Sequence, residues 1–163
     1  MSSEPDQRLM CGGWLRSGLL LVAATTLGAG LWALPFPRSF YGDFPFPGWD
    51  WISTLGPYNE HLIRDYGAMN LALAVLLVSA AISPERALSR VALLTYLAFA
   101  IPHFVFHAAQ THHFSLFHNV LQLGSLGFLV LLSGALLVLT TLGLAHIRVK
   151  PAERPKHKGG TTL

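Results

Sequence analysis

Two pairs of side chains in this sequence have the types and the spacing that a metal ion requires. His61 is followed four residues later by Asp65, and His103 is followed four residues later by His107. Residues four apart share one face of an α-helix, so each pair presents two ligands in the same direction. Imidazole nitrogens together with a carboxylate suit zinc, iron or copper. We therefore predict a metal site formed by these four residues.

The predicted heights of the two pairs agree with one shared site. The helices that carry them are joined by a tight turn at Ser83-Pro84-Glu85, with Ser83 as the expected N-cap of the next helix, and must be antiparallel neighbours. At about 1.5 Å of rise per residue, Asp65 and His107 each lie about 25 Å from this turn. Asn70 is expected near His103 below them. Three protein ligands and an open position would make the site catalytic, and haem is the other cofactor that we consider.

Four long apolar segments must position these residues. A bilayer core about 30 Å thick needs about 20 residues of helix, and a soluble bundle would show a polar face that stretches such as 71–78 lack. The composition agrees, because 52% of the residues are hydrophobic and only 12% are charged, against roughly a quarter in soluble domains. We predict an all-α polytopic membrane protein, a four-transmembrane-helix bundle within residues 14–147, with spans at about 14–34, 65–82, 91–109 and 120–145.

The basic residues predict how this bundle is oriented. Short cytoplasmic loops carry an excess of Lys and Arg, and here the excess falls before the first span, between the second and third, and after the fourth. Both termini are therefore expected in the cytoplasm, as an N-terminal segment at 1–13 and a basic tail at 148–163. The tail is expected to lie against anionic lipid headgroups and not to bind nucleic acid. The basic residues on this side are Arg8, Arg16, Arg86, Arg90, Arg148, Lys150, Arg154, Lys156 and Lys158.

Several enzyme classes are excluded by the sequence. The single cysteine, Cys11, allows no intramolecular disulfide and no dithiol redox chemistry within this chain. The sequence also has no internal repeat, no glycine-rich phosphate loop and no serine nucleophile elbow. Any chemistry therefore depends on the histidines and the carboxylates.

The loop at 35–58, on the outer side in this orientation, is unusually rich in aromatic residues. Aromatic rings at this density are typical of a membrane interface, where they anchor a protein among the lipid headgroups. The alternative is that the loop forms a lid over a site for a hydrophobic ligand. The candidate lid residues are Phe44, Phe46, Trp49 and Trp51.

The histidines also have explanations that involve no metal. His61 and His107 lie near predicted helix ends, where water reaches them. A His103 side chain that hydrogen-bonds to Asn70 would only hold two helices together. Ionisable groups inside a membrane span also serve proton or ion pathways. For the other histidines on the outer side, His112, His113 and His118, a solvated membrane interface is the expected role.

The charged residues beside the predicted site differ in their expected partners. Arg64 is expected to pair with Glu60, four residues earlier on the same helix, and so to support the site together with Asn70. Asp65 has no such charged partner in the sequence. This difference makes Asp65 the stronger candidate for a ligand.

Two short stretches carry a resemblance to a known group of proteins. The run GPYNEHLIRDYG at 56–67 and PHFVFH at 102–107 resemble an uncharacterised family of four-helix membrane proteins from actinobacteria, distantly similar to DoxX-like proteins. The resemblance covers roughly residues 15–145 and implies a four-helix protein of the bacterial plasma membrane. DoxX-like proteins are associated with membrane redox chemistry. The positions that the resemblance marks are His61, Arg64, Asp65, His103 and His107.

Three functions from different classes remain. The one that we favour is a metal- or haem-dependent membrane protein, an oxidoreductase acting on a quinone or lipid in the outer leaflet. The second is a non-enzymatic accessory subunit that packs against a membrane-protein partner in a larger complex. The third is a carrier or binding protein for a hydrophobic ligand held under the aromatic loop. The lipid bilayer is the expected surrounding in each case, and a homodimer is compatible with all three.

Overall fold

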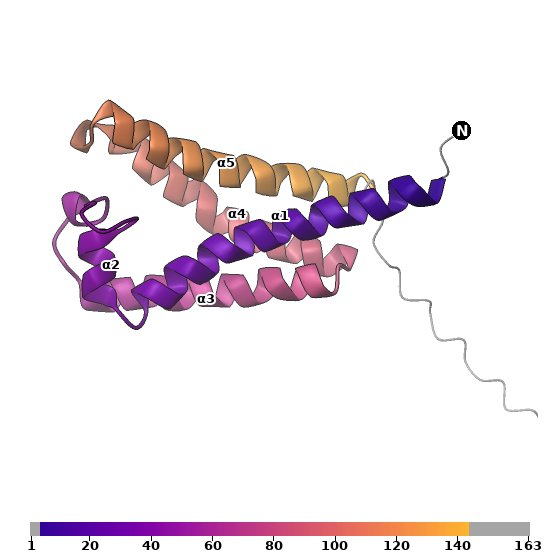
Figure 1. Cartoon of the computed structure of the whole chain (residues 1–163), viewed down its shortest axis with the longest axis horizontal. Helices are drawn as coiled ribbons and strands as arrows, with labels where there is room; N and C mark the ends of the chain where they lie inside the picture. The colour runs from indigo at the N-terminus through magenta and orange to yellow at the C-terminus, as the bar shows by residue number, and fades with distance from the viewer. Residues whose placement is uncertain (1–3, 144–163) are drawn as a thin grey trace, which may run out of the picture.

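The structure, a computed structural model, describes residues 4–143 and is built from helices joined by short connections (Figure 1). Within these residues the predicted all-α, four-helix architecture is confirmed, because four helices are long and apolar enough to span a membrane. These are α1 (Glu4–Ala33, of which Gly13–Ala33 is the apolar part), α3 (Glu60–Ile82), α4 (Arg86–Ala109) and α5 (Leu116–Thr141). The shorter elements are α2 (Pro37–Asp43) and the 3-10 helices η1 (Ser53–Leu55) and η2 (Thr111–His113).

Polar caps make two of the helices begin earlier than their apolar segments do. The side chain of Asn59 accepts a hydrogen bond from Leu62 N at 3.1 Å, so α3 begins at Glu60, before the apolar span that was predicted from about residue 65. The side chain of Ser115 accepts one from His118 N at 3.3 Å, so α5 begins before residue 120. Capping satisfies free amides in the first turn, and it therefore sets a helix start independently of hydropathy.

The connections differ in detail from the predicted ones. Ser83 ends α3, and Glu85 is the residue that precedes α4, so the expected N-cap role of Ser83 is wrong. At the N-terminus, α1 extends back into the segment 1–13 that was expected to be separate. The predicted end of the fourth span at 145 and the basic tail at 148–163 lie outside the described residues.

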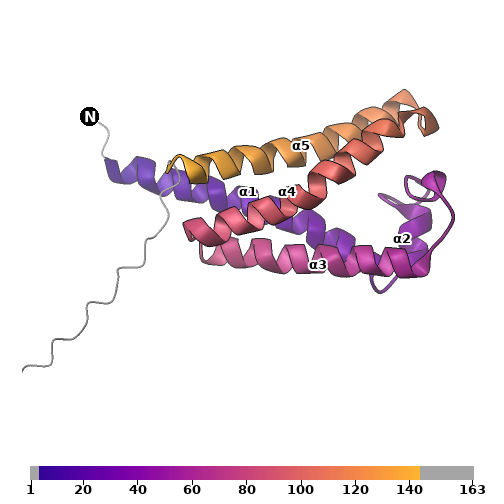
Figure 2. The ribbon, with the colours of Figure 1, turned by 180° about the vertical axis from the view of Figure 1, so that it is seen from behind.

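The four long helices form two closely packed pairs, α1 with α3 and α4 with α5. Figures 1 and 2 show that the pairs lie close together where α3 turns into α4 and diverge toward the end that carries α2. The main hydrophobic core joins all four helices and includes Leu19, Leu77, Leu93 and Leu136. The expected tight turn between α3 and α4 is present, but each of these helices packs more extensively against another partner.

Glycine residues bring α1 and α3 close together near the diverging end. A Cβ added to Gly67 would lie only 2.6 Å from the backbone nitrogen of Leu34, and one added to Gly30 would lie 3.0 Å from Gly67 O. Arg64 joins the same two helices, because its Nη1 donates a hydrogen bond to Leu34 O. Small residues allow helix backbones to approach in this way. This contact fixes the point from which the aromatic loop departs.

The aromatic loop, residues 35–58, packs against the helices at the diverging end. Phe40 of α2 is buried, and its ring centroid lies 5.7 Å from that of Trp32 and 5.6 Å from that of Tyr66. The hydroxyl group of Tyr41 donates a hydrogen bond to Gly56 O at 2.7 Å, which ties the start of the loop to its end. The loop is thus a folded unit anchored on α1 and α3.

Candidate functional site

A cavity of about 1130 Å³ is lined by residues of α1, the aromatic loop, α3, α4 and α5. Sites for small molecules typically measure about 300–1,000 Å³, so this cavity has room for a molecule of lipid size. Small residues form its wall on α1, namely Ala24, Gly28 and Ala29. A Cβ added to Gly28 would meet no atom within 4 Å, because that position faces the open space.

Aromatic side chains make up much of the remaining wall. All four candidate lid residues, Phe44, Phe46, Trp49 and Trp51, line the cavity. They also contact one another, with ring centroids 5.7 Å apart for Phe46 and Trp49 and 5.5 Å apart for Trp49 and Trp51. Rings from the long helices complete this lining: Tyr66 of α3, and Tyr96, Phe99 and Phe106 of α4.

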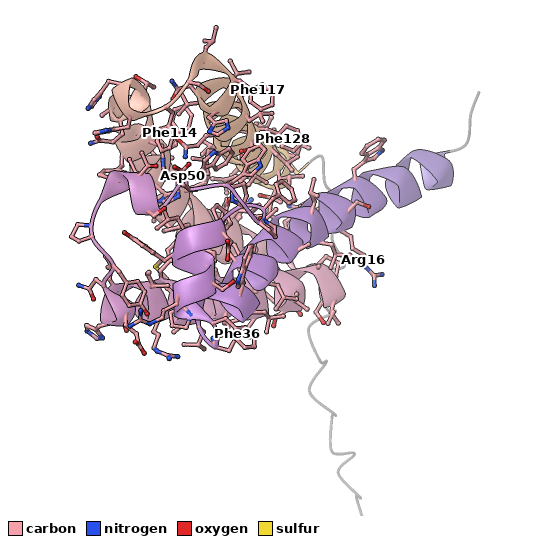
Figure 3. All side chains as sticks on the ribbon, turned by 60° about the vertical axis from the view of Figure 1, so that its left-hand side comes forward. Arg16, Phe36, Asp50, Phe114, Phe117 and Phe128 are labelled. Carbon is pink, nitrogen blue, oxygen red and sulfur yellow. The ribbon has the colours of Figure 1, made fainter. Side chains whose placement is uncertain are left out.

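The aromatic loop also reaches the opposite helix pair, at the first turn of α5. The Trp49 ring stacks on His118 with centroids 4.8 Å apart and lies 6.3 Å from the Phe117 ring. In Figure 3, Asp50 of the loop lies between Phe36, next to α2, and Phe117 on α5. The loop therefore joins the two helix pairs across the diverging end.

Three buried polar atoms on the cavity wall have no hydrogen-bond partner among the described residues: Trp51 Nε1, His107 Nδ1 and Gln122 Oε1. The three residues are 8%, 9% and 3% exposed, so bulk water does not satisfy these atoms. Gln122 of α5 lies beside His107 of α4, and Trp51 contacts the ring of His118 one turn before Gln122. Buried polar atoms in folded proteins nearly always have partners. This group is therefore a place where a bound molecule would find hydrogen bonds.

The other polar groups on the cavity wall are largely satisfied by their own helices. The hydroxyl groups of Thr25, Thr26 and Ser125 donate to backbone carbonyls three or four residues earlier. Asn70, which the sequence placed near His103, lines the cavity with it, and its Nδ2 donates to Tyr66 O at 2.9 Å. Trp51, His107 and Gln122 are thus the lining residues that carry fully buried polar atoms without a partner.

The structure does not bring the four predicted metal ligands together among the described residues. His103 and His107 line the cavity, with ring centroids 4.6 Å apart. His61 and Asp65 form a pair at 3.3 Å, but their side chains are 87% and 63% exposed and line no part of the cavity. Among the described residues, no group of three or more His, Cys, Asp or Glu side chains is placed to hold a metal ion.

The separation has a simple geometric cause. On α3 the buried face carries Ile63, Gly67 and Asn70, and residues spaced by three and four occupy one side of a helix. His61 and Asp65 fall on the opposite side. The equal height of Asp65 and His107 was compatible with a shared site, but height along a helix does not determine which way a side chain points.

The predicted ion pair between Glu60 and Arg64 is confirmed, with Arg64 Nη2 2.9 Å from Glu60 Oε1. Asp65 lies 3.3 Å from the ring of His61, the residue with which its spacing of four predicted a pair. Two residues of the site were missed, His118 and Gln122. The signal for Gln122 was present, since a lone amide in an otherwise apolar membrane span usually faces protein rather than lipid.

The fold and this site define a class of protein, a four-helix bundle of membrane-spanning length with an aromatic cavity between its two helix pairs. Comparison of the chain with protein-family models, with curated proteins and with solved structures found no match. The resemblance to actinobacterial and DoxX-like membrane proteins therefore stays a prediction.

Proposed function

We propose that this protein binds a largely apolar, lipid-like molecule in the cavity under the aromatic loop, as a carrier or binding protein of the bacterial plasma membrane. The observation that carries the proposal is a cavity of about 1130 Å³ whose wall is mainly aromatic and aliphatic. An apolar molecule gains about 25 cal/mol for each Å² of apolar surface removed from water, and aromatic rings supply large contact areas. The bilayer is the source from which such a molecule would come.

The packing of the aromatic loop supports this proposal over the simpler role of a membrane anchor. Anchoring rings extend outward among the lipid headgroups. In this protein Phe40 and Trp51 are only 2% and 8% exposed, and both line the cavity. Phe36 and Phe46 are more exposed, at 64% and 62%, so part of the loop remains available to the headgroups. The loop therefore has an inward face that an anchor does not need.

The metal-dependent oxidoreductase favoured from the sequence loses its main argument in the structure. That argument was a four-ligand site, and only His103 and His107 of its members line the cavity. Two imidazoles in a cavity are also suitable hydrogen-bonding groups for a bound organic molecule. Ligand binding thus accounts for these histidines without a further protein ligand.

A fluorescence titration tests the proposal directly. The protein is purified in dodecyl maltoside and titrated with 1-bromohexadecane, whose bromine quenches nearby tryptophans such as Trp49 and Trp51 on the cavity wall. We expect saturable quenching in the wild type. In Gly28→Leu, the new side chain would enter the cavity and weaken binding by about tenfold or more, or about 1.4 kcal/mol.

Gly134→Leu is the matched control for this substitution. A Cβ at Gly134 of α5 also meets no atom within 4 Å, but Gly134 does not line the cavity. We expect it to titrate like the wild type. Quenching that rises without saturation, or that is equally affected in both variants, would show simple partitioning into the micelle and overturn the proposal.

A further inference from the structure

We infer that the molecule held in this cavity has an uncharged head group that carries a hydroxyl, placed at the aromatic-loop end, and a hydrocarbon tail that extends between the helix pairs. This inference rests on the proposed function and adds the chemical class of the ligand. Two independent features of the cavity wall support it: the absence of charged side chains from its described residues, and the kinds of hydrogen-bonding atoms left without partners.

No Asp, Glu, Lys or Arg is among the described residues that line the cavity. Asp43 and Asp50 are neighbours in sequence of lining residues of the aromatic loop, but neither lines the cavity. On α3, Glu60 pairs with Arg64, and Asp65 lies beside His61. An ionised carboxylate or phosphate inside an apolar cavity needs an opposite charge, because the cost of removing it from water is otherwise not recovered. The wall therefore favours a neutral head group over that of a fatty acid or a phospholipid.

The unpartnered atoms offer a ligand both a donor and an acceptor. The indole N–H of Trp51 can only donate, and the amide oxygen of Gln122 can only accept. His107 Nδ1 can serve in either role. A hydroxyl group donates one hydrogen bond and accepts others, so it matches this set, whereas an ether, an ester or a hydrocarbon can donate no hydrogen bond to Gln122 or to the neighbouring His107.

The position of these atoms gives the ligand a direction. Gln122 lies one turn after His118, the residue that the aromatic loop contacts, and is thus near the loop end of the cavity. Farther along α5, the wall continues with Leu126 and Leu129, and α4 contributes Ala100. The head group is therefore placed near the loop and the tail toward the middle of the bundle.

Competition for the 1-bromohexadecane site tests this inference with four probes that share one chain length. These are hexadecane, hexadecan-1-ol, hexadecanoate at pH 8.5 and hexadecylhydroquinone, each added until the tryptophan quenching is relieved. We expect the alcohol, the hydroquinone or both to compete at about one tenth of the concentration needed for hexadecane or hexadecanoate. One additional hydrogen bond between ligand and protein produces a difference in affinity of about this size. The comparison of alcohol with hydroquinone then separates an aliphatic from an aromatic head group.

A substitution at Gln122 assigns the effect to the proposed atoms. Gln122→Met keeps the size of the side chain but removes the acceptor. We therefore expect the hydroxyl probes to compete with this variant no better than hexadecane does. Each hydroxyl probe is compared with hexadecane in the same variant, so that any change in the affinity for 1-bromohexadecane is common to all probes. Ser133→Ala is the control, because Ser133 Oγ is also buried and unpartnered but lies away from the cavity. It should leave the ranking of probes unaltered.

The possible results separate the failure of this inference from the failure of the proposed function. Equal competition by all four probes, or strongest competition by hexadecanoate, would overturn the inference about the head group while leaving an apolar binding site. An advantage of the hydroxyl probes that survives Gln122→Met would also overturn it. No saturable binding of 1-bromohexadecane to the wild type would overturn both.

Discussion

The indole ring of Trp49 lies almost parallel to the imidazole ring of His118, with ring centroids 4.8 Å apart and planes inclined by 9°. Trp49 belongs to the aromatic loop, which is anchored on α1 and α3, and His118 belongs to the first turn of α5. This contact therefore bridges the two helix pairs where they diverge. A loop that moves to admit a ligand has to break it.

Loss of the His118 ring is predicted to speed ligand release. Aromatic contacts of this kind are worth about 0.5–1.5 kcal/mol, so His118→Ala should raise the dissociation rate of 1-bromohexadecane about 2- to 12-fold. Stopped-flow recovery of tryptophan fluorescence after dilution measures this rate. His118→Phe, which keeps a flat ring, should stay close to the wild type. His113→Ala is the control, because His113 is exposed and its ring packs on His112. Equal rates in all variants would show that the contact does not restrain the loop.

Replacement of Gly67 by alanine is predicted to destabilise the protein. The added Cβ would lie 2.6 Å from Leu34 N, and since that neighbour is backbone, α1 and α3 would have to separate. Overpacking of this kind costs about 1–3 kcal/mol. Thermal unfolding in detergent, followed by circular dichroism, measures the loss. In Gly124→Ala the new Cβ meets no atom within 4 Å, and alanine favours helix, so that control should gain about 0.5–1 kcal/mol. A Gly67→Ala protein as stable as the wild type would contradict the close contact.

The two predicted ligand pairs are expected to respond differently to removal. The double variant His61→Ala, Asp65→Ala removes an exposed pair on one helix, so it should change stability by less than about 0.5 kcal/mol and leave ligand binding unchanged. The double variant His103→Ala, His107→Ala alters the cavity wall and should weaken binding of hexadecan-1-ol. Metal analysis of both variants and of the wild type belongs with this experiment. A metal ion that is present in the wild type and lost from both variants would support the predicted metal site shared by the two pairs.

The orientation predicted from the basic residues can be tested with single cysteines in a Cys11→Ser background. Asp50 in the aromatic loop and Ser83 at the α3–α4 turn are both exposed and lie at opposite ends of the bundle. In intact cells, a membrane-impermeant maleimide should label Asp50→Cys but not Ser83→Cys. Both should be labelled after the cells are permeabilised. The reverse pattern would place the aromatic loop in the cytoplasm.

Hydropathy was a reliable guide to the architecture and a poorer one to the limits of the helices. A stretch of about 20 apolar residues can satisfy its backbone in a bilayer only as a helix, so α1, α3, α4 and α5 follow from composition alone. Their first turns contain polar residues, and there Asn59 and Ser115 determine where α3 and α5 begin. Asn and Ser are favoured N-caps, but the same preference predicted an N-cap at Ser83 that the structure does not have.

The sequence by itself determined the four helices and the contacts within one helix, such as Glu60 with Arg64, because these depend only on local spacing and hydrophobicity. The tertiary structure decided which faces meet. It turned His61 and Asp65 away from the cavity, and it placed Gln122 beside His107 and His118 against Trp49. Spacing along one helix leaves its rotation about the axis open, and that rotation follows from the packing of all four helices together. The cavity depends in addition on how far the helix pairs diverge, which only packing between them sets.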